Sequence, residues 1–273
     1  MGERDRWLPR HARDDPEAAQ AIETLHGGIP PWLRGHLDDW LRQSAPVDRF
    51  GFWEGRPHLR LQAAFGTTLP IHVSGLDAEQ ALDVIDYLLA EGGVDPTDCE
   101  ELEQLLSEGR SAWRATPHGL QRRVEATLQR GVARVVGAPG RPGRYLEDAW
   151  QKAWGRRPDA SGAYRAAVQA VEASYQPIVS PRNKRTTLGG LIRDIEGAPT
   201  KFRVRFQGDG PEENVHRLVA MLRLLWRSQW DRHGIVDEDV PLHVSLDEAR
   251  DAVALSASLV HLAQDGGFIA AGA

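Results

Sequence analysis

Apolar residues recur at intervals of three and four positions along most of the chain, which is the spacing of an amphipathic helix. The clearest stripe contains Val215, Leu218, Leu222 and Leu225. The same period predicts helices over residues 16–25, 30–41, 77–91, 98–106, 118–136, 145–154, 158–175, 188–195, 211–230 and 245–262. We therefore expect a mainly α fold.

One stretch departs from this period. Residues 50–74 contain several glycines and prolines and two short runs, 58–63 and 69–73, that are rich in strand-favouring residues. Such runs between turn residues indicate a two-stranded hairpin or an irregular wrap. The first half of the chain is therefore predicted to be mostly helical, with a small β-hairpin.

The segment from Gly137 to Gly143 combines three glycines with two prolines, a composition typical of a linker. We place a domain boundary there. Residues 1–140 then form a mostly helical N-terminal domain. Residues 145–273 form a C-terminal bundle of four or five helices joined by short loops, in which Pro177 ends one helix and Ser245 caps the last.

Composition narrows the class of protein. Hydrophobic residues make up 41% of the chain and charged residues 26%, as in an ordinary globular protein. There is no apolar run long enough to span a bilayer, and the charged N-terminus lacks the apolar core of a secretory signal. The single cysteine, Cys99, has no partner for a disulfide and no neighbours at metal-ligand spacing. We expect a cytoplasmic protein without cofactor or metal, and with no membrane partner.

Charge is distributed unevenly. The formal net charge of −6 argues against a protein that coats nucleic acid indiscriminately. Residues 156–205, however, carry 10 basic and 4 acidic side chains. A polyanion such as RNA would therefore be expected to bind the second half of the chain.

The most unusual polar cluster follows the stripe of residues 211–230. Five polar residues crowd the end of that helix before a glycine stop: Arg227, Gln229, Asp231, Arg232 and His233. Arg227 and Asp231 are four positions apart, so they can pair on one helix face. A structural interpretation is also open, because basic residues near a helix C-terminus commonly interact with the last carbonyls.

An arginine beside a histidine suits the cleavage of an RNA phosphodiester without metal. The ribose 2′-OH attacks the adjacent phosphorus, the histidine transfers protons, and the arginine offsets the charge of the phosphorane. In this interpretation Arg227 binds the phosphate, His233 is the general acid and base, and Asp231 orients one of them. Arg232 and Gln229 are included in the same site.

Arg227, five intervening residues and His233 fit the Arg-x(4–6)-His signature of the HEPN superfamily. The segment 231–234 resembles the end of the abortive-infection C-terminal family, as do the helix 163–172 and the loop 177–189. The resemblance covers about the last 125 residues. It implies a metal-independent endoribonuclease of prokaryotic defence or toxin type, a homodimer formed through the C-terminal bundle, and a role for Glu172 as an orienting carboxylate.

The basic loop residues Arg182, Lys184 and Arg185 precede a predicted helix N-terminus and are candidates to bind substrate phosphate. One residue departs from the family pattern, because Ser228 follows Arg227 where HEPN nucleases often have Asn, Asp or His. Two alternatives therefore stay open. The chain could be a non-catalytic helical module that binds a protein or a nucleotide, or a structural assembly subunit whose N-terminal domain contacts a partner protein.

Overall fold

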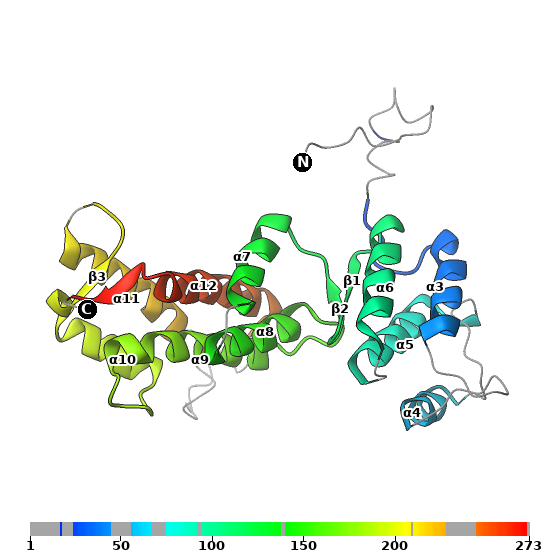
Figure 1. Cartoon of the computed structure of the whole chain (residues 1–273), viewed down its shortest axis with the longest axis horizontal. Helices are drawn as coiled ribbons and strands as arrows, with labels where there is room; N and C mark the ends of the chain where they lie inside the picture. The colour runs from blue at the N-terminus through cyan, green and yellow to red at the C-terminus, as the bar shows by residue number, and fades with distance from the viewer. Residues whose placement is uncertain are drawn as a thin grey trace. The chain divides into compact units, whose positions relative to one another are not determined.

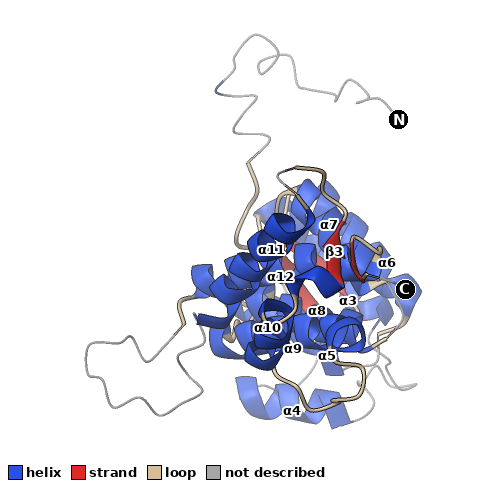
Figure 2. Ribbon diagram, turned by 90° about the vertical axis from the view of Figure 1, so that its left-hand side faces the viewer, coloured by secondary structure: helices blue, strands red, loops and turns tan. Residues whose placement is uncertain are grey.

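The computed structural model describes residues 17, 24–44, 56–66, 75–91, 94–137, 140–208, 210–227 and 244–271. Within these residues the chain is mainly helical, as predicted, and its strands are confined to short pairs (Figure 2). The chain forms two compact units, residues 1–123 and 124–273, each with its own hydrophobic core. In this part of the chain no helix has the length and apolar character needed to cross a membrane.

The described residues of the first unit form helices and a β-hairpin (Figure 1). Its elements are α3 (Pro31–Ser44), α4 (Arg56–Phe65), α5 (Ala78–Glu91), α6 (Pro96–Glu108), β1 (Trp113–Thr116) and β2 (Gly119–Arg122). The apolar stripes predicted for α3 and α5 are buried, including Leu37 and Trp40 on α3 and Leu82 and Ile85 on α5. The periodicity therefore predicted these helices correctly. The helix predicted over residues 16–25 lies almost entirely outside the described residues.

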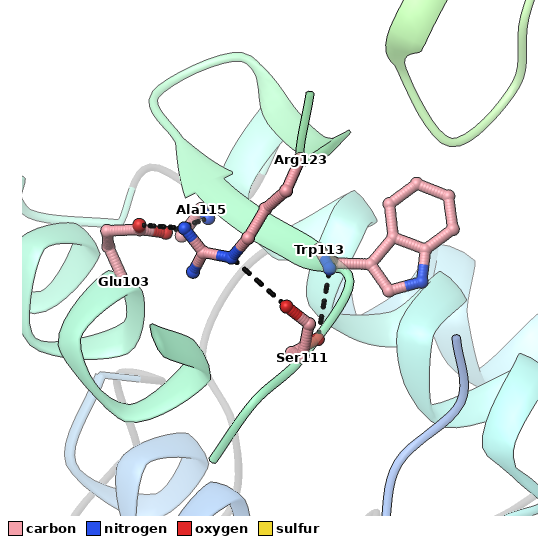
Figure 3. Close-up of polar contacts among 5 residues, drawn as sticks. All are labelled: Glu103, Ser111, Trp113, Ala115 and Arg123. Atoms are coloured by element: carbon pink, nitrogen blue, oxygen red, sulfur yellow. Dashed lines mark hydrogen bonds and ion pairs between the residues drawn. The ribbon is translucent and has the colours of Figure 1, made fainter. Parts of the chain in front are cut away.

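The hairpin is held to the helices by carboxylates. Strands β1 and β2 pair antiparallel, from Trp113 opposite Arg122 to Thr116 opposite Gly119. Glu103 on α6 accepts a hydrogen bond from the backbone N–H of Ala115 (2.8 Å) and pairs with Nη1 of Arg123 (2.8 Å), as Figure 3 shows. Arg123 also donates from Nε to the backbone oxygen of Ser111 (3.0 Å). One carboxylate thus binds β1 and the residue that follows β2 to α6.

Replacing Glu103 by alanine is expected to destabilise the first unit by about 1–3 kcal/mol. The change leaves the guanidinium of Arg123 and the Ala115 N–H without their acceptor, and both are partly buried. Equilibrium unfolding in urea would measure the loss. Glu101→Ala is the matched control, because Glu101 is an exposed residue of the same helix. Equal unfolding curves for the two variants would contradict the structural role of Glu103.

The second unit is a bundle with one short sheet (Figure 1). Its elements are α7 (Ala126–Val136), α8 (Arg141–Trp154), α9 (Ala160–Val179), α10 (Leu188–Glu196), the 3₁₀ turn η2 (Pro199–Lys201), β3 (Phe202–Val204), α11 (Pro211–Arg227), α12 (Leu246–Gln264) and β4 (Phe268–Ala270). Helix α9 packs against α8, α10 and α12 and is the centre of the bundle.

Small residues let neighbouring helices approach α9 closely. Ala163, Ala167 and Ala170 are fully buried along it. Two buried tyrosines of α9 also hold other helices through their hydroxyls. Tyr164 donates to the backbone oxygen of Leu225 on α11 (2.6 Å), and Tyr175 donates to that of Leu259 on α12 (3.2 Å). Burial raises the pKa of Tyr175, so its hydroxyl stays a donor.

The prediction of the hairpin was wrong in its position. Residues 58–63, predicted as a strand, belong to helix α4, while residues 69–73 lie outside the described residues. The described hairpin is instead at 113–122, and the helix predicted from His118 begins only at Ala126. A strand of four residues is defined by its partners, here Glu103 and Asp86, which bind backbone N–H groups of β1 and β2. The period of a single segment does not contain that information.

The division between the units also differs from the predicted linker. Helix α8 begins at Arg141, inside the segment 137–143, because Pro142 is compatible with the first turn of a helix. Val132 and Val135 of α7 share a core with Leu146 of α8. Helix α7 therefore belongs to the second unit, whereas the sequence placed it in the first.

Two predicted helix ends need correction. Pro177 lies inside α9, which continues to Val179, because a proline in the last turn removes only one helical hydrogen bond. Helix α6 begins at Pro96, two residues before its predicted start, and is capped by Asp95, which accepts from the N–H of Thr97. The cap predicted at Ser245 is confirmed, since its side chain accepts from the backbone N–H of Glu248.

Candidate functional site

The predicted site residues fall into two groups. Gln229, Asp231, Arg232 and His233 lie outside the described residues. Arg227 is described as the last residue of α11, and four further candidates lie within the described second unit: Glu172, Arg182, Lys184 and Arg185. The roles assigned to all of these residues stay predictions. What the structure adds is the surroundings of the end of α11.

The C-terminal turn of α11 is fixed by two contacts. The hydroxyl of the buried Tyr164 donates to the backbone oxygen of Leu225, in the last described turn of α11. The indole of Trp226 packs directly on Gly189. A Cβ atom at Gly189 would lie 2.8 Å from Cζ2 of that ring, so only glycine fits beneath it without a shift. Arg227 follows Trp226 and therefore starts from a fixed backbone position.

Gly189 belongs to the first turn of α10, so the end of α11 lies against the N-terminus of α10. Glu172 of α9 reaches the same turn, where its Oε1 accepts a hydrogen bond from the N–H of Leu188 (2.7 Å). Thr187 accepts from the N–H of Gly190 as the N-cap. A carboxylate at a helix N-terminus is stabilised by the free N–H groups and by the helix dipole. Glu172 is thus a cap of α10 that lies beside the contact between α10 and α11.

The loop before α10 presents positive charge. Arg182, Lys184 and Arg185 are exposed, and none of them has an ion-pair partner among the residues that the structure describes. The loop backbone is ordered locally, because the N–H of Asn183 donates to Ser180 (3.0 Å) and the Asn183 side chain accepts from Arg185 N–H (3.2 Å). Ser180 in turn donates to Asp194 of α10 (2.5 Å). Three cations are therefore available to an anion on a loop of defined shape.

The described residues offer neither a metal site nor a reactive thiol. Among the described residues, no group of three or more His, Cys, Asp and Glu side chains could hold a metal ion. Cys99 is buried on α6, and burial raises the pKa of its thiol, which makes it a weak nucleophile.

Sequence reasoning missed the residues that bring these parts together. Gly189 was not among the residues predicted to form the site. The signal that could have been used is the glycine inside a helix start, which often marks a close approach by another group. Nothing in the sequence identified Trp226 as that group or Tyr164 as the donor to α11.

Comparison of the chain with models of known protein families, with curated proteins and with solved structures finds no match in any of the three.

Proposed function

We propose that the protein is a metal-independent endoribonuclease whose active site forms at the C-terminal end of α11. The observation that supports it is the contact of Trp226 with Gly189, which brings the end of α11 against the first turn of α10. This contact brings three parts of the bundle into one region: Arg227, the carboxylate of Glu172, and the N-terminus of α10, which follows the basic loop.

The charges of this region suit an RNA phosphate. The three cations of the loop before α10 have no counter-ion among the described residues, so they attract the phosphate backbone of RNA. Glu172 is the described carboxylate that contacts the first turn of α10, where it accepts a hydrogen bond from a backbone N–H. The positive end of the helix dipole partly compensates its negative charge. A phosphate beside it is therefore repelled less than by a free carboxylate.

In the proposed reaction the 2′-OH loses its proton to His233 and attacks phosphorus, while Arg227 stabilises the charged phosphorane. The bond to the 5′ oxygen breaks, and that oxygen takes up a proton. The products are a 2′,3′-cyclic phosphate and a 5′-hydroxyl. Incubation of the full chain with single-stranded RNA in excess chelator tests this proposal. Cleavage that yields these ends supports it, and intact RNA at high enzyme concentration contradicts it.

Replacing Arg182, Lys184 and Arg185 together by glutamine is expected to weaken RNA binding without changing the fold. Each phosphate contact to single-stranded RNA contributes about 0.7 to the slope of log affinity against log salt concentration. The slope should therefore fall by up to about 2, and affinity in low salt should fall by about tenfold or more. Filter binding or anisotropy over a series of salt concentrations measures both quantities.

The matched control removes the same charge from exposed arginines elsewhere: Arg60, Arg122 and Arg130. If non-specific attraction by net charge dominates, this triple glutamine variant lowers the slope equally. That outcome would exclude the basic loop as the phosphate-binding surface.

A further inference from the structure

A groove of about 430 Å³ lies between α7 and α12 in the second unit. None of its lining residues belongs to the candidate nuclease site. Its volume lies within the range of about 300–1,000 Å³ that is usual for small-molecule sites. The apolar part of its wall comes from both helices: Leu128, Val132, Ala254 and Ala257.

The groove exists because small residues line both helices. Gly131 lies on the α7 side, and a Cβ atom there would meet no other atom within 4 Å. On α12 the wall is made of Ala254, Ala257 and Ser258. Glycine in the interior of a helix costs stability relative to alanine, by up to about 1 kcal/mol in general. Gly131 is exposed and lines the groove, so no side chain narrows the groove at this position.

Positive charge gathers along part of this groove. Arg134 and His261 line it. Next to them Asp265, just after α12, pairs with Nη1 of Arg205 (2.7 Å). The pKa of Asp265 is lowered, first by the hydrogen bond from Arg205 and its charge, and further by His261 and Arg134. Asp265 is therefore paired with Arg205, and the guanidinium of Arg134 is left without an ion pair among the described residues.

Glu125 is the acidic residue among those that line the groove. Glu125 caps α7 and accepts hydrogen bonds from the N–H groups of Thr127 (2.7 Å) and Leu128 (3.1 Å). These bonds lower the pKa of Glu125, because they stabilise its ionised form. Its charge is thus engaged by the N-terminus of α7, whereas Arg134 in the last turn of α7 has no described ion-pair partner of its own.

We propose that this groove binds an elongated apolar molecule that carries one carboxylate, with its chain against Val132 and Ala257 and its head beside Arg134 and His261. An apolar chain gains from the burial offered by the small-residue walls. A carboxylate replaces its lost water with charge-assisted hydrogen bonds. A cationic head would be repelled by the guanidinium, and an uncharged head would form no ion pair with it. This site is independent of RNA cleavage.

Titration calorimetry of the full chain with decanoate, decanol and decyltrimethylammonium, each below its micelle concentration, tests the proposal. We expect saturable binding of one decanoate, and binding of the other two about tenfold weaker or undetectable, a difference of about 1.4 kcal/mol. Decanol that binds as tightly as decanoate would overturn the anionic preference, and no binding of decanoate would overturn the site.

Two variants of one position locate the ligand. Gly131→Leu should fill the groove and reduce decanoate affinity at least about tenfold, while Gly131→Ala, which adds only a methyl group, should stay within about threefold of the parent chain. Unchanged affinity in Gly131→Leu would place the ligand elsewhere. If circular dichroism shows that Gly131→Leu fails to fold, Arg134→Gln tests the site instead. This variant removes the cation that binds the ligand's carboxylate and leaves the apolar walls of the groove intact. A loss of about tenfold supports the proposal, and an unchanged affinity overturns it.

Discussion

Alanine at His233 is expected to slow RNA cleavage by about a hundredfold or more, since general acid–base catalysis contributes about 10²–10⁴ to a rate. Alanine at Arg227 should cost a similar factor, because a donor aimed at a developing oxyanion is worth about 10²–10³ in kcat. Groups that act in one step are not additive. The double variant should therefore be about as slow as the slower single variant. Initial rates with a labelled RNA in chelator measure all three.

The control for these rates is Arg223→Gln. Arg223 lies one turn before Arg227 on α11 and pairs with Glu196 (2.5 Å), so it has a similar charge and helix position but a structural partner. Its loss should leave the rate within about twofold, because an exposed pair contributes at most about 1 kcal/mol, and that to stability. Equal losses in Arg223→Gln and Arg227→Ala would indicate that charge on α11, and not a positioned arginine, supports cleavage. Full activity in His233→Ala would end the catalytic assignment.

The parts of the fold that were predictable are those encoded within one segment. The helices α3, α5 and α9 were found because their buried residues repeat with the helical period, and the cap at Ser245 was found because a cap binds an N–H only three residues away. The hairpin was not found, because the N–H groups of Ala115 and Leu120 are bound by carboxylates 12 and 34 residues distant. The compact units divide away from the predicted linker for the same reason. The glycines and prolines of 137–143 are locally turn-like, yet Leu146 and Val132 draw both flanking helices into one core.

The candidate site, too, was only partly predictable from the sequence. The types of residue that suit phosphate chemistry, Arg227 and the loop cations, were visible in the sequence. Their neighbourhood was not, because it depends on Trp226 meeting Gly189, 37 positions earlier, and on Tyr164 holding Leu225, 61 positions later. Glu172 shows the limit of a predicted role. The resemblance gave it the task of orienting the arginine–histidine pair, while the structure gives it a contact with Leu188 that any capping carboxylate could make.

Replacing Phe268 by alanine is expected to cost the second unit about 3–5 kcal/mol, the usual range for deleting a buried aromatic ring. Phe268 is fully buried on β4, and its ring stacks between those of Tyr175 (5.2 Å between centroids) and Phe202 (5.5 Å). Pairing of β4 with β3 depends on the same residue, since Phe268 lies opposite Val204. Because domains are stable by only about 5–15 kcal/mol, this single change should lower the unfolding midpoint in urea markedly.

Ile269→Ala provides the comparison, since Ile269 is the next residue of the same strand but is 41% exposed. Its effect should stay within about 0.5 kcal/mol if the face of β4 toward Phe202 carries the packing energy. The pair also separates folding from chemistry. Phe268 has no role in the proposed reaction, so Phe268→Ala should cleave RNA at nearly the parental rate at low temperature, where it remains folded, and lose activity on warming together with its structure. Rate loss at low temperature with an intact circular dichroism spectrum would show instead that the β3–β4 pair contributes directly to the site, through β3 and its connection to α11.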